Sequence, residues 1–188
     1  MRPAIPLALL LACGGCKDKP SAGGDPAPGS ATDPPGTTSG PSAVTFQTLP
    51  FQQGARIPTE FTCDGADQSP PLSWTGGGDA KSWVLIVDDP DAPGGTFTHW
   101  MLYDIPIATN ALPRSSSAIG VPGKNDFGKT GYGGPCPPHG SNHRYFFKLY
   151  AENVPTLGLP PGATRAQLDK AMAGRQIATT SFMGTYGR

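Results

Sequence analysis

The residues that could do chemistry fall in two short segments. The first, 88–93, has carboxylates at three of its first four positions and is followed by His99. The second, 131–140, is rich in Gly and Pro and is followed by His143 and Arg144. Carboxylates this close together repel one another unless they are paired, whereas the free amides of a rigid Gly/Pro loop can form a nest for an anion. Together the two segments predict a small anion-binding site.

Each polar side chain has an expected role in such a site. We expect Asp89 to orient an imidazole, while His99 and His143 donate hydrogen bonds to the anion, more strongly when they are protonated. Asp91 is expected to cap backbone amides of its own loop in an Asx-type turn. Successive residues of a strand point to opposite faces, so Arg144 is predicted to be a structural ion-pair partner rather than a ligand group.

The N-terminus has the pattern of an export signal. Arg2 is followed by a short apolar run that cannot span the roughly 30 Å of hydrocarbon in a bilayer. Leu10–Cys13 resembles the cleavage box of bacterial lipoproteins, which predicts that residues 1–12 are a signal peptide and that Cys13 is lipidated. Cys16 is the alternative lipidation site. The alternative to lipidation is an ordinary signal peptide with incidental cysteines.

Residues 13–43 are predicted to be a disordered tether. Positions 14–43 contain seven Gly and six Pro but no aromatic residue, Leu, Ile, Val or Met, so burial cannot offset the entropy of ordering them. Residues 44–188 hold every Trp, Tyr and Phe and are enough for one domain with a core. Because 14 basic residues balance 14 acidic ones, we expect no nucleic acid as a partner.

The segments that must position the polar residues have the pattern of strands. Residues 82–87 form a nearly continuous apolar run, which is typical of a buried central strand. Long Gly/Pro-rich connections indicate an antiparallel sandwich or barrel. Aromatic and β-branched residues predict further strands at 44–51, 56–61, 97–105 and 145–151.

One helix is predicted near the C-terminus. Thr164 can cap it with Gln167 as its capping-box partner, and Gly174 suits its end. Leu168 and Met172 share one face of this helix and should pack on the sheet.

Other residues are expected to have structural or solvated roles. Trp74, Trp83 and Trp100 are most simply core residues. In the long connection 106–130, Lys124, Asp126 and Lys129 are expected to form an exposed surface, and His139 is expected to be a solvated loop residue.

The cysteines of the domain, Cys63 and Cys136, form an even pair, which in an exported protein predicts a disulfide first. Zinc binding is the alternative, because Cys136, His139 and His143 are spaced as C-x2-H-x3-H. No second C-x2-C half accompanies that spacing, so the zinc signal is weak.

Five motifs, in order along residues 44–188, resemble those of the phosphatidylethanolamine-binding proteins, also called Raf-kinase-inhibitor-like proteins. The C-terminal segment 184–188 is similar to the ending of the bacterial branch, the YbhB/YbcL type. Each motif is short, but five in order are specific. They are Ser69-Pro70-Pro71-Leu72-Ser73-Trp74, Asp89-Pro90-Asp91-Ala92-Pro93, His99-Trp100, Gly131-Tyr132-Gly133-Gly134-Pro135-Cys136-Pro137-Pro138 and His143-Arg144-Tyr145.

The resemblance implies a mostly β protein, an antiparallel β-sandwich with one or two short helices, one of them near the C-terminus. It also implies a small pocket for phosphate, a phospho-headgroup or a similar anion, with no metal and no cofactor. The Cys63 and Cys136 pair resembles exported bacterial members, where a disulfide is expected. Phe97 matches a pocket aromatic of some eukaryotic members. By matched positions, the pocket walls would be Asp89, Asp91, His99, Pro138, His143 and Tyr145.

We therefore expect a lipid-anchored protein of the bacterial cell envelope that binds a small anion without catalysis. The membrane would be a partner only through the N-terminal lipid, with the domain on the periplasmic or outer face. The alternative is an inhibitor or regulator of a periplasmic protease or another envelope protein, as some family members are. A hydrolase ranks last because neither a G-x-S-x-G nucleophile motif nor a phosphate-binding P-loop occurs.

Overall fold

The computed structural model describes residues 43–188, so the predicted signal peptide, the lipidation site and almost all of the predicted tether lie outside the described residues. The elements are β1 (Thr45–Thr48), the 3-10 helix η1 (Thr59–Phe61), β2 (Leu72–Thr75), β3 (Ser82–Asp89), β4 (Phe97–Pro106), β5 (Ala111–Leu112), β6 (Val121–Pro122), β7 (Asn142–Glu152), α1 (Arg165–Met172) and β8 (Gln176–Gly187).

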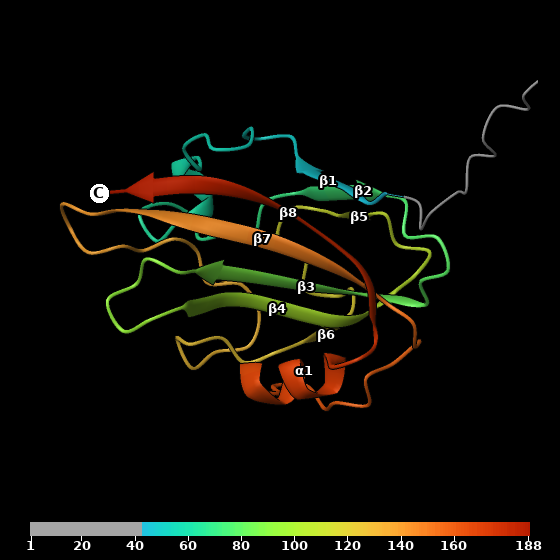
Figure 1. Cartoon of the computed structure of the whole chain (residues 1–188). Coiled ribbons are helices and arrows are strands. Elements are labelled where there is room, and N and C mark those ends of the chain that lie inside the picture. Colours follow the sequence, from blue (N-terminus) through green and yellow to red (C-terminus); the bar gives the residue numbers. More distant parts are fainter. Residues whose placement is uncertain (1–42) are drawn as a thin grey trace, which may run out of the picture. The chain divides into compact units, whose positions relative to one another are not determined.

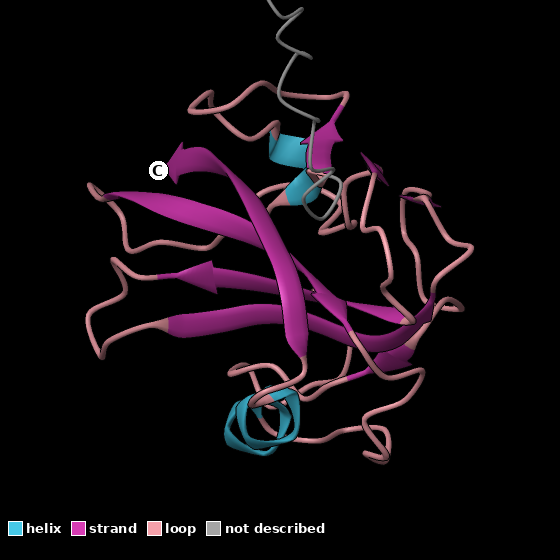
Figure 2. Cartoon of the chain, turned by 45° about the vertical axis from the view of Figure 1, so that its right-hand side comes forward, coloured by secondary structure: helices cyan, strands magenta, loops and turns pink. Residues whose placement is uncertain are grey.

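These strands form two antiparallel sheets, and α1 covers the outer face of the larger one (Figure 1). The smaller sheet has the order β1-β2-β5 and the larger one β6-β4-β3-β7-β8. Figure 2 shows the larger sheet between the small sheet and α1. The predicted antiparallel sandwich with a helix near the C-terminus is confirmed.

The two faces of β3 explain why its sequence is apolar throughout. Trp83, Leu85 and Val87 belong to the core between the two sheets, whereas Val84 and Ile86 belong to a second core beneath α1. A central strand covered on both faces has no polar side, so alternation disappears. The three tryptophans are buried in the core between the sheets, as predicted.

Asp88 ends the helix-facing row of β3 and is 1% exposed. Its carboxylate accepts a hydrogen bond from Lys148 Nζ at 2.9 Å and others from Arg165 and the Thr98 hydroxyl. Arg165 is the first residue of α1. A buried charge is tolerated only when it is paired, so this cluster fixes the start of α1 on the sheet.

The helix forms where the sequence predicts it. The Thr164 hydroxyl accepts a hydrogen bond from the backbone N–H of Gln167, and the side-chain oxygen of Gln167 accepts one from the backbone N–H of Thr164. Together the two bonds make a capping box. Leu168 and Met172 are buried against the sheet. Gly174 follows the helix with a φ of 74°, a conformation that favours glycine.

Two strand predictions need correction. Residues 56–61 are not a strand, because only Arg56 makes a β-bridge and a 3-10 turn follows at Thr59–Phe61. Pro58 precedes that turn, and proline has no N–H to continue a ladder. The sequence prediction also omitted the short strands β2, β5 and β6 and the long strand β8. Gly184 of β8 is required because a Cβ there would lie 2.6 Å from the Ile57 side chain.

Within residues 43–188, no helix is both long and apolar enough to span a membrane.

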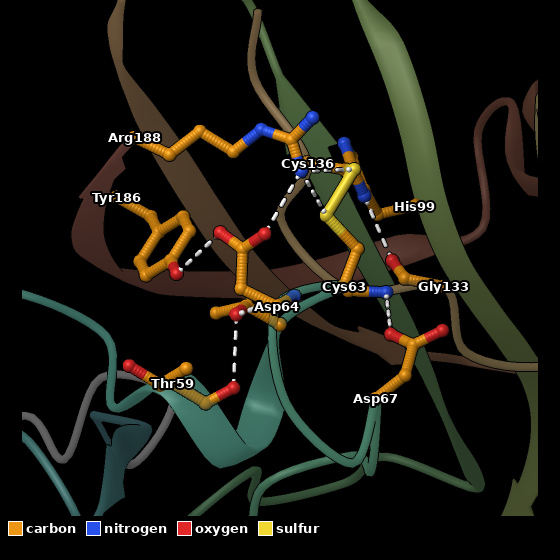
Figure 3. The surroundings of a disulfide bond; sticks show 11 residues. Thr59, Cys63, Asp64, Asp67, His99, Gly133, Cys136, Tyr186 and Arg188 are labelled. Atoms are coloured by element: carbon orange, nitrogen blue, oxygen red, sulfur yellow. Dashed lines mark hydrogen bonds and ion pairs between the residues drawn. A yellow bond between two sulfur atoms is a disulfide. The ribbon is translucent and has the colours of Figure 1, made fainter. Parts of the chain in front are cut away.

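A disulfide joins Cys63, just after η1, to Cys136 in the Gly/Pro loop, with a Cα–Cα distance of 5.4 Å (Figure 3). The Cys63 N–H also donates to the Pro135 carbonyl at 3.1 Å, so the two segments are joined by their backbones as well. Arg188 lies over the bond and pairs with Asp64. The disulfide prediction is confirmed, and the zinc alternative fails because the Cys136 sulfur is in the disulfide.

Replacing both Cys63 and Cys136 by Ser is expected to lower the free energy of unfolding by about 4 kcal/mol, because the disulfide closes a long loop and restricts the unfolded chain. Urea unfolding of the full-length protein, followed by tryptophan fluorescence, measures the loss. Reducing the wild type should shift the midpoint in the same direction. Equal midpoints for the oxidised and reduced wild type would contradict the prediction.

Glu152, at the end of β7, should make stability depend on pH. The residue is fully buried, and neither carboxylate oxygen has a hydrogen-bond partner within the described part of the chain. Burial raises the pKa of Glu152 from 4.5 to about 7. The folded protein therefore holds this proton more tightly than the unfolded chain, and stability present below pH 4.5 is lost as the pH rises through about 7.

The Glu152→Gln variant removes this titration. Between pH 5 and pH 8, the free energy of unfolding of the wild type should fall further than that of the variant, by at most about 3 kcal/mol. Urea midpoints across this range measure the difference. Glu60→Gln is the matched control, because Glu60 pairs with Arg114 at the surface and its variant should keep the wild-type profile. Parallel profiles for wild type and Glu152→Gln would refute the prediction.

Candidate functional site

A pocket of about 210 Å³ lies where the end of β3, the start of β4 and the start of β7 meet the loop 131–140. We call it the histidine pocket. It is lined by Asp89, Ala92, Pro93, Phe97, His99, Phe127, Cys136, Pro137, Pro138 and His143.

Asp89 and His143 form a buried pair at this pocket. Asp89 Oδ2 accepts from His143 Nδ1 at 2.8 Å, and Asp89 Oδ1 accepts from the Asp91 N–H at 2.8 Å. Asp89 and His143 are only 3% and 6% exposed. The predicted role of Asp89, orienting an imidazole, is confirmed. The buried Asp89 carboxylate is tolerated because both of its oxygens accept hydrogen bonds.

His99 reaches the same pocket through a β-bulge. Val87 is opposite Trp100 and Asp88 is opposite Thr98, so His99 is an extra residue without a partner on β3. A bulge bends a strand and re-aims its side chains. The His99 ring accordingly contacts Tyr145, with ring centroids 5.2 Å apart, rather than the core beneath α1.

The two imidazoles are held in the same way. His99 Nδ1 lies 2.8 Å from the Gly133 carbonyl oxygen, and His143 Nδ1 lies 2.8 Å from an Asp89 oxygen. Carbonyl and carboxylate oxygens can only accept, so each Nδ1 carries the hydrogen. Nε2 is then the ring nitrogen left for a ligand in both histidines. Burial lowers the pKa of His99, and the Gly133 hydrogen bond partly opposes this effect.

Two amides of the Gly/Pro loop are not free for an anion, although the sequence suggested an amide nest. The Gly133 N–H donates to the His99 carbonyl, and the Gly134 N–H donates to Asp67 Oδ1 at 2.7 Å. Prolines 135, 137 and 138 have no N–H. These two glycine amides therefore hold the loop on β4 and on Asp67, and the imidazole nitrogens are polar groups that remain for a ligand.

Asp91 does not line the pocket, and its predicted Asx role was wrong. Its carboxylate accepts three hydrogen bonds from Arg144, one from the backbone N–H and two from the guanidinium. These bonds lower the pKa of Asp91 to about 2. The Asx-type turn belongs to Asp89, which accepts the Asp91 N–H two residues on. Arg144 is an ion-pair partner, as predicted.

Tyr145 is close to the site but is not in the pocket lining. It is fully buried, its ring packs against the edge of His99, and its hydroxyl has no hydrogen-bond partner among residues 43–188. Burial and then the nearby Asp89 charge raise its pKa. Its observed contact is with the His99 ring, so it supports that ring.

Phe127 is a wall that the sequence prediction missed. It belongs to the connection 106–130, for which only an exposed surface of charged residues was predicted, and it is 42% exposed. Its ring packs on Phe97 at 4.7 Å and on His99 at 5.3 Å between centroids. Gly133 lies directly beneath it, where a Cβ would come within 2.6 Å of the ring. The sequence signal that could have identified this wall is that Phe127 is the one aromatic residue of the connection 106–130. His139 is exposed and outside the lining, as expected.

Relatives of this chain share the domain over most of its length. The UPF0098 protein of Aquifex aeolicus is 50% identical over 145 residues, which are 73% of this chain and 85% of the relative. A Mycobacterium tuberculosis protein named "Putative lipoprotein LppC" is 40% identical over 189 residues and covers 96% of this chain and 92% of its own length.

Solved structures show the same fold. The homologue CT736 of Chlamydia trachomatis superposes with a TM-score of 0.74 at 39% identity, covering 78% of this chain and 98% of the other. The YbcL protein of E. coli gives 0.72 at 30% identity, with 79% and 99% covered. The family model "Phosphatidylethanolamine-binding protein" matches residues 47–187. Since that match spans most of the sequence, the chain belongs to the phosphatidylethanolamine-binding protein family.

Proposed function

We propose that the histidine pocket binds a small anion, phosphate or a phospho-headgroup, and does not turn it over. The observation that carries this proposal is the matched anchoring of His99 and His143. Each ring is fixed through Nδ1, which leaves two Nε2 atoms at one small pocket. A protonated imidazole donates a charge-assisted hydrogen bond, which is the interaction an anion requires.

Binding without turnover is supported by the chemistry of the lining. The residues that line the pocket include no serine, threonine, lysine or tyrosine, and their one cysteine is in the disulfide. A covalent mechanism needs an activated nucleophile beside a base. The family name supports a phosphorylated headgroup as one form of the anion.

Because the pKa of His99 is lowered, the affinity of the pocket for an anion is expected to depend on pH. A neutral His99 can only accept at Nε2, so it must take up a proton before it can donate to a fully ionised anion. Anion binding is therefore linked to proton uptake and weakens as the pH rises.

We also propose that the protein is anchored by a lipid at Cys13 on the bacterial envelope, with residues 13–43 as a tether. The match to the mycobacterial protein named a lipoprotein covers 96% of this chain, so it extends beyond the domain into the N-terminal segment. The Aquifex match covers 73% of this chain.

The pH dependence is best measured with sulfate, which has no proton to lose near neutral pH. In isothermal titration of the full-length protein, sulfate affinity should be higher at pH 6 than at pH 8, by up to about tenfold per pH unit for each proton taken up. Inorganic phosphate and O-phosphorylethanolamine test the natural chemistry. Their relative affinities distinguish a free phosphate from a headgroup.

The His143→Ala variant should weaken sulfate binding by about tenfold or more, because a charge-assisted hydrogen bond is lost. His139→Ala is the matched control and should bind like the wild type, since His139 is exposed and outside the lining. The proposal fails if none of the three anions binds, or if both variants weaken binding equally.

The Cys13→Ala variant should abolish labelling of the full-length protein by a radioactive fatty acid in a bacterial host. Cys16→Ala should leave labelling unchanged. If the two results are exchanged, Cys16 carries the lipid, and if both variants are labelled like the wild type, the anchor proposal is wrong.

A further inference from the structure

A second pocket, of about 400 Å³, lies farther along β4 from His99. Trp100 and Leu102 form its wall on the strand, and Tyr132 forms a wall on the Gly/Pro loop. Four serines give it most of its polar groups, namely Ser69, Ser115, Ser116 and Ser117. We call it the serine pocket.

The polar lining of the serine pocket differs from that of the histidine pocket. Serine and Thr130 hydroxyls and the Gln68 amide line it, each able to donate and to accept. Asp67 is the one carboxylate among the lining residues, and no lysine, arginine or histidine is among them. Nothing in this lining would neutralise an anion, so it selects against the ligands that suit the histidine pocket.

The backbone is strained at two points of this lining. Asp67 and Ser115 have φ values of 53° and 56°, and they are two of only three non-glycine residues with positive φ in the described part of the chain. The carboxylate of the third, Asp104, binds Thr156 and the Leu157 N–H, as that of Asp67 binds the Gly134 N–H. Strain of this kind persists where the surrounding structure enforces it and clusters at ligand sites.

Two buried polar atoms of the lining residues are unpaired. The Trp100 indole N–H and the Ser116 hydroxyl have no hydrogen-bond partner among residues 43–188. The Ser116 backbone is fixed, since its N–H donates to the Ser69 hydroxyl at 3.1 Å.

We infer that the serine pocket binds a neutral ligand rich in hydroxyl groups, of the chemical class of a sugar unit. Such a ligand presents donors and acceptors together, which serine and amide groups match. It also presents apolar C–H surface, which the partly exposed ring of Tyr132 can cover. A simple cation is a poorer match, because one oxygen of Asp67 already accepts the Gly134 N–H. The inference does not depend on the function of the histidine pocket.

The test is an amide chemical-shift titration of the isotope-labelled full-length protein. N-acetylglucosamine and glucose are the probes, and choline and sulfate are the comparison ligands. Tens of millimolar of at least one sugar should shift the amides of 67–69, 115–117 and 130–132. Sulfate should leave these amides in place, and choline should shift them less than the sugar does.

The Ser116→Ala variant should weaken sugar binding by about tenfold, as expected for one lost hydrogen bond. Asp67→Asn keeps an oxygen for the Gly134 N–H and should weaken it to a similar degree. Ser181→Ala, at an exposed serine of β8, is the control and should bind like the wild type. Sulfate binding and the urea midpoint of Ser116→Ala should not change, which separates a ligand contact from a structural role.

Three outcomes would overturn the inference. The first is the absence of shifts with both sugars. The second is stronger binding of choline than of either sugar. The third is unchanged sugar binding in Ser116→Ala.

Discussion

Two adjacent carboxylates are buried at the end of β3, and much of the structure around them follows from pairing both. Asp88 and Asp89 are 1% and 3% exposed. Because neighbouring residues of a strand point to opposite faces, no single partner can serve them both. Asp88 meets Arg165 and Lys148 on the helix side, and Asp89 meets His143 between the sheets. Leaving either charge unpaired would cost several kcal/mol, roughly 3–5 by analogy with broken buried pairs. The pairing of these two adjacent residues thus fixes the position of α1 on the sheet and that of His143 in the histidine pocket.

The second histidine reaches that pocket only because β4 departs from regular pairing. An unbroken register would place His99 on the face that α1 covers, in line with Met101 and Tyr103. The bulge opposite Val87 and Asp88 removes His99 from the ladder. Its Nδ1 is then held by the Gly133 carbonyl, while the Gly133 N–H returns a bond to the His99 carbonyl. A reciprocal pair of this kind fixes the ring to the loop and the loop to the strand.

The helix and the strands β1, β3, β4 and β7 could be predicted from the sequence, whereas β2, β5, β6 and β8 were missed. The apolar run of β3 and the capping box of α1 are local signals, and both were interpreted correctly. So were the opposite directions of His143 and Arg144, because alternation follows from strand geometry alone. The role of Asp91 was wrong because its partner, Arg144, comes from a distant strand. The bulge at His99 leaves no local sequence signal, since it depends on the register with β3.

The composition of the Gly/Pro loop correctly suggested a rigid segment, but two of the glycine amides expected to bind an anion hold the loop in place instead. The sequence suggested free amides for an anion, but the amides of Gly133 and Gly134 bind β4 and Asp67. The loop is held a third time by the disulfide at Cys136. His99 lines the histidine pocket and Asp67 lines the serine pocket. The Gly/Pro loop is therefore bonded to one lining residue of each pocket. A segment with so many fixed points has little freedom to relay movement. The loop therefore lies between the histidine pocket, for which we propose an anion, and the serine pocket, whose lining has no cationic side chain.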